Sequence, residues 1–293
     1  MFIYQVAIGD TRGEMKVYDV NLNLIKSFQA HTWDIYRIKQ SPFYNSYVAT
    51  CSWDNTVKIW NNNNWNLIQT YTKHTDWVFG LEWINKETIA SCSWDGTIHI
   101  WLISTGQTQR IINTGSEARS LKLLQNGIHL ACGLYNGQIN IYNLNDGIKI
   151  STLQGHSSYV NDLILINESL LASSSADNNI GIWDLTLNKE KFILNGHQNS
   201  VYGLKLINSN ILASGSLDNT IKLWNIQNGS EIRILKGHTS DILWSLDLLN
   251  DGQKLVSGSG DKTIKLWDWT TGECLKTIET GLNIWSLSII KNN

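Results

Sequence analysis

Residues 216–225, SLDNTIKLWN, recur in close copies along this chain of 293 residues. The other copies are SWDNTVKIWN (52–61), SWDGTIHIWL (93–102), LYNGQINIYN (134–143), SADNNIGIWD (175–184), SGDKTIKLWD (259–268) and, in degenerate form, DTRGEMKVYD (10–19). The aromatic residue near the end of each copy returns every 41 to 43 residues. A fixed period of this length indicates a repeat architecture with seven units.

Each unit contains four short stretches of strand-like sequence. In the sixth unit these are VYGLKLI, ILASGS, TIKLWN and EIRILKG, separated by Asn, Asp and Gly. Alternation with a period of two and β-branched residues favour strands, and no stretch has a sustained helical period. Such units bury both faces only by packing against neighbours, and a closed ring leaves no unprotected end. We therefore predict an all-β, seven-bladed β-propeller of four-stranded antiparallel blades.

The two ends of the chain are expected to share one blade. The first unit has only three strand-like stretches, and the last residues, NIWSLSII (283–290), match the innermost strand of the other units. The C-terminal strand should therefore close the N-terminal blade. On this scheme, residues 1–293 form a single propeller, with blade 1 from 1–29 plus 283–290. Blades 2–7 are then expected at about 34–72, 77–114, 118–154, 160–195, 201–236 and 242–280.

The composition excludes several classes of partner. The 23 Lys and Arg are balanced by 25 Asp and Glu, so a polyanion such as nucleic acid, or an anionic membrane, is not expected. The N-terminus lacks a basic region with a cleavage site, and no apolar stretch approaches the length of a membrane span. The four cysteines form no C-x-x-C pair. We expect an intracellular, cytoplasmic protein.

The repeat resembles that of the WD-repeat (WD40) β-propeller family, in which each unit carries Gly-His near its start and Trp-Asp near its end. Gly-His occurs at 155–156, 196–197 and 237–238, and looser forms occur at 30–31 and 73–74. The resemblance implies a buried structural network in each complete blade, made of a His, a turn Asp, a strand Ser or Thr and the Trp. Its residues here would be His31, His74, His156, His197 and His238; Asp54, Asp95, Asp177, Asp218 and Asp261; and Trp60, Trp101, Trp183, Trp224 and Trp267.

Three units depart from this pattern. The fourth unit lacks the His and has Asn136 and Tyr142 in place of Asp and Trp, and the first has Arg12 and Tyr18 there. In the seventh unit, GHTSDILWSL, the apolar residue after His238 comes one position late, which predicts a one-residue bulge.

No catalytic or metal-binding pattern is present. Outside the network positions only His99 and His129 remain, and neither has a nucleophile at a recognisable spacing. The sequence has no G-x-S-x-G, Walker, H-E-x-x-H, calcium-loop or zinc pattern. The innermost strands carry charged residues of both signs that do not repeat at one position from unit to unit. They are Arg37, Lys39, Glu82, Lys122, Asp162, Lys205 and Asp247. We predict a protein that is not an enzyme and has no cofactor, no catalytic residue and no metal.

Aromatic residues gather at three repeat positions that should meet on the face where the innermost strands begin. The residue before the turn acid is Thr11, Trp53, Trp94, Tyr135, Ala176, Leu217 and Gly260 in successive units. The residue before the first apolar residue of the innermost strand is Asp34, Trp77, Glu117, Tyr159, Ser200, Asp241 and Asn283. The residue after it is Tyr36, Phe79, Arg119, Asn161, Tyr202, Leu243 (or Trp244, with the bulge) and Trp285.

A contiguous aromatic surface with acids beside it suits a protein partner, and a Lys or Arg side chain in particular. The predicted partner-binding residues are Trp53, Trp94, Tyr135, Trp77, Phe79, Tyr36, Asp34, Glu117 and Arg119. We expect a non-catalytic interaction scaffold for a protein or a linear, basic peptide, monomeric and either free-standing or a module of a larger protein.

Three alternatives stay open at this point. The rings could close the mouth of the channel with no ligand. The central funnel could instead bind a small ligand or sugar, or, with less support, carry a hydrolase site.

Overall fold

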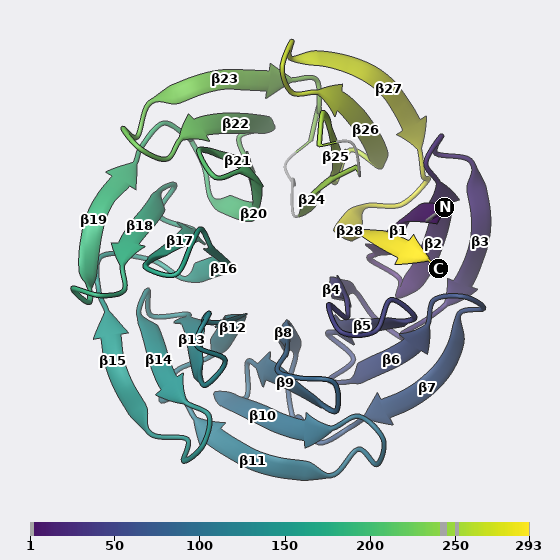
Figure 1. Cartoon of the computed structure of the whole chain (residues 1–293). Helices are drawn as coiled ribbons and strands as arrows, with labels where there is room; N and C mark the ends of the chain where they lie inside the picture. The colour runs from purple at the N-terminus through teal and green to yellow at the C-terminus, as the bar shows by residue number, and fades with distance from the viewer. Residues whose placement is uncertain (1–2, 241–244, 250–251, 293) are drawn as a thin grey trace.

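The computed structural model describes residues 3–240, 245–249 and 252–292, which form seven four-stranded antiparallel sheets in a ring (Figure 1). The predicted all-β, seven-bladed propeller is confirmed. No helix occurs among these described residues, so none of them forms a helix that could span a membrane.

The strands of each blade are ordered from the central channel outward. Blade 1 contains β28 (Ile284–Asn292), β1 (Ile3–Asp10), β2 (Glu14–Asp19) and β3 (Leu24–Gln29). Blade 2 contains β4 (Ile35–Gln40), β5 (Tyr47–Ser52), β6 (Val57–Asn61) and β7 (Asn66–Tyr71). Blade 3 contains β8 (Val78–Trp83), β9 (Thr88–Ser93), β10 (Thr97–Leu102) and β11 (Thr108–Asn113). Blade 4 contains β12 (Ala118–Leu123), β13 (His129–Leu134), β14 (Ile139–Asn143) and β15 (Lys149–Leu153).

The remaining blades repeat the same order. Blade 5 contains β16 (Val160–Leu165), β17 (Leu170–Ser175), β18 (Ile180–Asp184) and β19 (Lys189–Leu194). Blade 6 contains β20 (Val201–Asn208), β21 (Ile211–Ser216), β22 (Thr220–Asn225) and β23 (Glu231–Lys236). Blade 7 contains β24 (Ser245–Leu248), β25 (Lys254–Gly258), β26 (Thr263–Asp268) and β27 (Glu273–Glu279).

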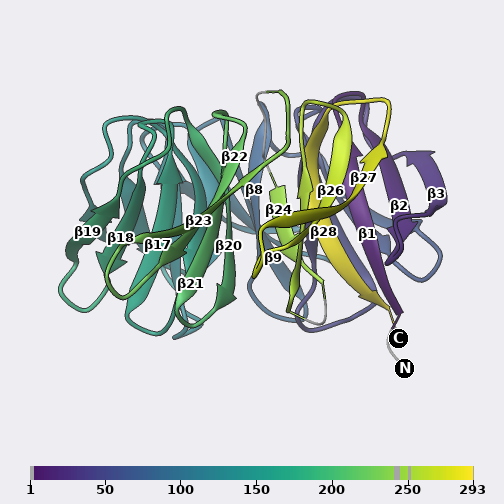
Figure 2. The ribbon, with the colours of Figure 1, turned by 90° about the horizontal axis from the view of Figure 1, so that it is seen from above.

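The ring closes between the two ends of the chain, as predicted. Strand β28 pairs antiparallel with β1 along its length, from Ile3 opposite Asn292 to Asp10 opposite Ile284. The termini lie together at one face of the ring (Figure 2). Because β28 runs toward this face, the innermost strands begin at the opposite face.

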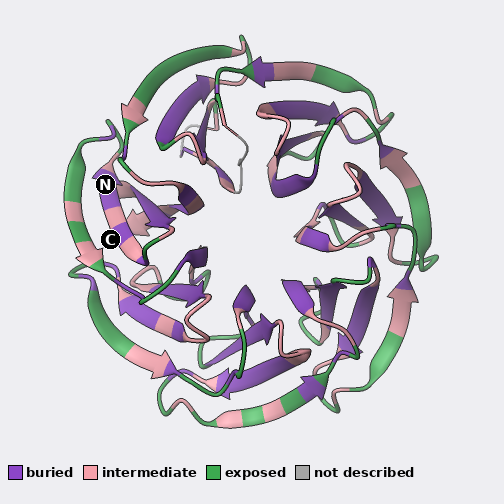
Figure 3. Ribbon diagram, turned by 180° about the vertical axis from the view of Figure 1, so that it is seen from behind, coloured by how far each residue is buried: buried purple, intermediate pink, exposed green. Residues whose placement is uncertain are grey.

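The core is divided among the junctions between adjacent blades. The buried apolar residues form seven clusters in the described part of the chain, and each joins two neighbouring blades. For example, Ile141 and Leu153 of blade 4 pack in one cluster with Val160 and Trp183 of blade 5. Burial is most complete in the second strands of the blades, such as β17 and β21, and least in the outermost strands (Figure 3). Each blade is therefore stabilised by its neighbours.

The turn between the second and third strands brings its residues to the face where the innermost strands begin. The residue after the turn acid has a positive φ, as in Asn55 (67°), Gly96 (76°) and Asn219 (67°). Asn and Gly adopt this conformation at little cost, which explains the Asp-Asn and Asp-Gly pairs of the repeat.

Bulges recur in the innermost strands. The register between the first and second strands shifts near the start of the innermost strand in six blades, for example between Ile35 and Arg37 in blade 2 and between Val78 and Gly80 in blade 3. The bulge predicted for the seventh unit falls on residues 241–244, outside the described residues.

Candidate functional site

A chain of hydrogen bonds links the Trp, the serine or threonine, the His and the Asp in each blade that has all four residues. Blade 6 serves as the example. The Trp224 indole N–H donates to Ser214 Oγ at 2.8 Å, and Ser214 in turn lies 2.7 Å from His197 Nε2. His197 Nδ1 lies 2.7 Å from Asp218 Oδ2. Because Ser214 accepts from the indole, its own proton goes to Nε2, and the imidazole donates its Nδ1 proton to Asp218.

The same arrangement occurs in blades 2, 3, 5, 6 and 7. The His–Asp distances lie between 2.7 and 2.9 Å. The hydroxyl that joins His to Trp comes from Thr50, Ser91, Ser173, Ser214 and Ser257 in turn. All fifteen residues of the predicted network therefore meet within their own blades.

The titration of His31 and of His238 fits a neutral imidazole. Burial lowers the pKa of His31 and of His238, and their Asp partners offset this only in part. Burial alone would raise the pKa of Asp54, but hydrogen bonds from His31 and Thr56 outweigh it and hold that pKa well below its usual range. At neutral pH His31 and His238 are then neutral imidazoles, and each donates a hydrogen bond to the carboxylate of its Asp partner.

In blades 1 and 4, which lack the network, the hydroxyl of a threonine at the His position donates a hydrogen bond to a backbone carbonyl of the preceding blade. Thr280 and Thr114 stand at the position of the His, four residues before the innermost strand. Thr114 donates to the Gly96 carbonyl at 2.7 Å, and Thr280 donates to the Lys262 carbonyl at 2.8 Å. These threonines link a blade to the turn of the preceding one, which the repeat pattern did not predict.

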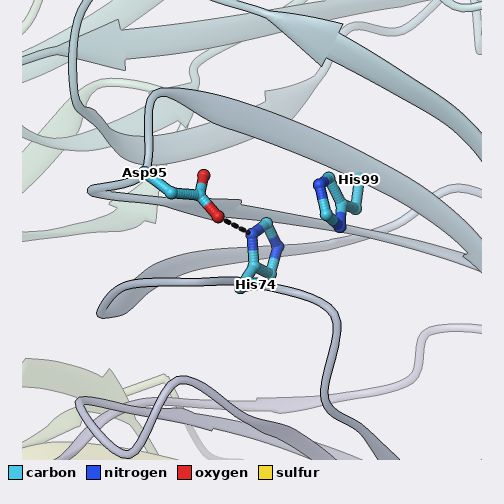
Figure 4. Close-up of side chains that lie close together, drawn as sticks. All are labelled: His74, Asp95 and His99. Carbon is cyan, nitrogen blue, oxygen red and sulfur yellow. Dashed lines mark hydrogen bonds and ion pairs between the residues drawn. The ribbon is translucent and has the colours of Figure 1, made fainter.

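Blade 3 contains a cluster of possible metal ligands, His74, Asp95 and His99 (Figure 4). His74 has both ring nitrogens engaged, with Asp95 at 2.9 Å and Ser91 at 2.8 Å, and His99 Nδ1 lies 2.8 Å from the Tyr71 hydroxyl. A cation would have to displace a network partner of His74. The cluster is therefore part of the blade's hydrogen-bond network.

The charged residues of the channel pair with one another. Arg37 contacts Asp162 at 2.9 Å, and Lys205 contacts Asp247 at 2.5 Å. Lys39 and Lys122 both pair with Glu82. Every residue of the mixture noted on the innermost strands is thus part of an ion pair. The charged residues that line the channel cavity of about 280 Å³ all belong to these ion pairs, and its two carboxylates, Asp162 and Asp247, are each engaged by a cation.

Above the channel lies a continuous layer of partly exposed rings, which we call the aromatic face. It consists of Trp33, Trp53, Trp77, Trp94, Tyr135, Tyr159 and Trp285. Trp33 and Tyr135 are the most open, with 51% and 43% of their surface exposed. The other five are half-buried.

The rings of the aromatic face contact one another in sequence. Trp53 and Trp77 are stacked, with centroids 4.4 Å apart and planes 9° from parallel. Trp77 meets Trp94 edge-on at 5.1 Å, and Trp94 lies 5.7 Å from Tyr135. Tyr135 stacks on Tyr159 at 5.3 Å. The line of rings extends from the second blade to the linker before the fifth.

Four residues predicted for the exposed site lie beneath it, which corrects that expectation. Tyr36, Phe79, Arg119 and Asp34 are only 1–6% exposed. The first three follow the first apolar residue of an innermost strand, where neighbouring strands converge on the channel and cover them. Burial and the charge of Asp10 raise the pKa of Asp34 to about 6.

Arg119 joins the buried layer to the aromatic face. Its guanidinium lies between the rings of Phe79 and Tyr159, 4.5 Å from each centroid. It also donates to the Tyr36 hydroxyl at 3.1 Å and to Asn161 Oδ1 at 3.2 Å. The buried cation is thus held by rings on two sides and by two hydrogen bonds.

The other predicted site residues reach the surface. Trp53, Trp77, Trp94 and Tyr135 belong to the aromatic face, and Glu117 is half-buried beside it, where it accepts a hydrogen bond from Ser116 at 3.0 Å. Trp33, Tyr159 and Trp285 were missing from the predicted set. Tyr159 and Trp285 occupy two of the three converging positions, so their repeat register could have identified them. Trp33 lies outside those positions.

Comparisons with known proteins agree with this architecture. Residues 22–61, 65–101, 147–184, 188–225 and 229–268 match the family described as "WD domain, G-beta repeat". The degenerate copies at 10–19 and 134–143 fall outside the matched ranges.

Individual relatives match only part of the chain. The mouse peroxisomal targeting signal 2 receptor is 43% identical over 53 residues, which are 18% of this chain and 17% of that protein. Peroxisome biogenesis protein 7 of Arabidopsis thaliana is 41% identical over 58 residues, 18% of each chain. The WD repeat-containing protein 55 homolog of Dictyostelium discoideum is 27% identical over 158 residues, which are 53% of this chain and 38% of that protein. The alignments thus span well under half of each relative.

Proposed function

Since this chain belongs to the WD-repeat β-propeller family, we propose that it is a non-catalytic interaction scaffold that captures a linear, basic segment of a partner protein on its aromatic face. The observation that carries this proposal is the unbroken line of partly exposed rings from Trp53 to Tyr159. Monomeric proteins seldom expose a contiguous apolar surface of this kind without a binding role.

The chemistry of the face favours a segment that carries Lys or Arg. Tryptophan and tyrosine give large contact areas at low entropic cost, and a cation above each ring contributes about 0.5 to 2 kcal/mol. Glu117 is half-buried beside Trp94, and the exposed Asp76 precedes Trp77. These carboxylates would attract a basic segment and repel an acidic one.

Packing needs alone do not account for the rings. The same turn position holds Ala176 in blade 5 and Leu217 in blade 6, although these blades carry the same network as blades 2 and 3. The packing and hydrogen bonds of Arg119 beneath the face support the proposal further, because side chains that are already held in place lose little entropy on binding. The receptor named among the relatives binds a targeting signal by its printed name, which agrees with recognition of a segment.

The test is binding of the wild type and of Trp53→Ala/Trp94→Ala to an array of basic peptides and their acidic counterparts. We expect the double variant to lose about tenfold or more in affinity for basic peptides while circular dichroism and melting show a folded protein. Leu217→Ala is the matched control, since it changes the same turn position in blade 6 and should bind normally.

Either of two results would refute the proposal. Unchanged binding by the double variant would place the partner on another surface. Absence of any peptide binding by the wild type would mean that the rings only close the mouth of the channel.

A further inference from the structure

One position of the outermost strand contacts the next blade around the ring. In each blade this outermost-strand residue pairs with the residue of the third strand that comes just before the repeat Trp or Tyr, as Arg110 pairs with Ile100 before Trp101. We call it the junction position. Its occupants in blades 1 to 7 are Lys26, Gln69, Arg110, Ser151, Phe192, Arg233 and Lys276.

Four of these side chains cross to the next blade and donate to backbone carbonyls there. Arg110 donates to the carbonyls of Asn145 and Asp146, both at 2.8 Å, and Arg233 donates to that of Thr271 at 2.6 Å. Lys26 and Lys276 make the same kind of contact. All of the acceptors lie in the turn between the third and fourth strands of the receiving blade.

The other two long side chains also fill their junctions. The Gln69 amide lies beside Gly106, and the Phe192 ring lies beside Gly229. Both glycines belong to the same turn of the next blade. Six of the seven junctions are thus closed by a long side chain from within the protein.

The junction between blades 4 and 5 is different. Ser151 is too short to reach the turn of blade 5, and a cavity of about 640 Å³ opens there. Leu124, Ile141 and Ile150 of blade 4 and Leu185 of blade 5 form apolar walls, and the carboxylate of the exposed Glu168 lies at the rim. Thr186, which corresponds to Asn145 in the turn of blade 4, also lines the cavity.

We propose that this cavity binds an arginine side chain of a partner polypeptide, which takes the place that Arg110 and Arg233 occupy at their own junctions. The apolar walls suit the methylene stem of the arginine. Its planar head would donate to the carbonyl oxygens of the Thr186 turn, and Glu168 would add a charge-assisted hydrogen bond. The contacts of Arg110 and Arg233 thus show how the arginine of the partner would be bound.

This site is separate from the aromatic face. Leu124 and Glu168 lie where innermost strands end, on the face that carries the termini, whereas the aromatic face lies where these strands begin (Figure 2). The chain would therefore contact partners through both faces of the ring.

The experiment uses a short glycine-flanked arginine peptide and the same peptide with citrulline, which keeps the shape but removes the charge. Methyl NMR of isoleucine-labelled protein should show shifts at Ile141 and Ile150 with the arginine peptide, with a dissociation constant on the order of 1 mM. Citrulline should bind about tenfold more weakly or not at all.

Two variants test directly whether the partner's arginine binds in the way that Arg110 binds at its own junction. Ser151→Arg should fill the cavity from within, abolish the shifts and raise the melting temperature. Arg110→Ser should open an equivalent cavity between blades 3 and 4 and create new peptide-dependent shifts at Ile100, which corresponds to Ile141.

Glu168→Gln, at an exposed residue, keeps the proposal testable if Ser151→Arg does not fold, and it should weaken binding severalfold. Wild-type methyl groups that do not respond to the arginine peptide would overturn the proposal. Binding that Ser151→Arg leaves intact in a folded protein would do the same.

Discussion

Blades 3 and 6 contain the same buried network but present different side chains at the aromatic face. In both, an indole N–H, a serine hydroxyl, an imidazole and a carboxylate are linked in the same order. The residue before the turn acid is Trp94 in blade 3 and Leu217 in blade 6. Because the network satisfies its polar groups within the blade, we expect the neighbouring surface position to vary at little cost in stability. The positions that hold the ring together are therefore separate from those proposed to bind.

The largest effect should come from breaking the shared network. Trp101 and Trp224 are 0% and 1% exposed. We expect Trp101→Ala and Trp224→Ala each to lower the free energy of unfolding by about 3–5 kcal/mol, because each leaves a cavity and removes the hydrogen bond that the buried serine accepts from the indole. Chemical denaturation measures both. A much smaller cost in one blade would show that the two networks are not equivalent.

An effect of intermediate size is expected at acid pH, where blade 3 should lose stability through a residue that blade 6 lacks. His99 of blade 3 stacks on His74, with centroids 4.0 Å apart, where blade 6 has Lys222. Burial, and then the charge of His74, lowers the pKa of His99 to about 4. An unfolded histidine titrates near pH 6.5, so the unfolded chain binds more protons and stability should fall as the pH drops from about 6.5 toward 4.

The variant His99→Lys should remove this part of the acid sensitivity. Urea denaturation at a series of pH values from about 7 to 4 measures it. The reciprocal change, Lys222→His, should make blade 6 more acid-sensitive. If the His99→Lys and wild-type proteins lose stability in parallel, His99 does not contribute.

The smallest effect on stability should come from exchanging the surface residues. Trp94→Leu and Leu217→Trp change half-buried positions beside an intact network, so we expect each to alter the free energy of unfolding by about 1 kcal/mol or less. Trp94→Leu should nevertheless weaken binding of basic peptides, whereas Leu217→Trp should not. A cost of several kcal/mol for Trp94→Leu would identify this ring as part of the core.

Much of the architecture follows from local sequence. The regular spacing of the seven repeat aromatics, which include Tyr18 and Tyr142 besides the five tryptophans, predicted the number of blades. The strand-like end of the chain predicted the closure of blade 1 by β28. The resemblance to the WD-repeat family predicted each network, and its members lie in one unit, although the Asp follows the His by 21 residues in three blades and by 23 in blades 2 and 7. The aromatic residues of the turns could be placed on one face for the same reason.

The sequence by itself thus determined the ring, its closure and the face to which Trp53, Trp94 and Tyr135 belong. Only the tertiary structure decided how deeply Tyr36, Phe79 and Arg119 lie, because several blades converge on the channel and cover these residues. It also decided that Ser151 leaves a cavity. A repeat pattern describes each unit alone, whereas the depth of a residue and the filling of a junction depend on side chains that other blades contribute.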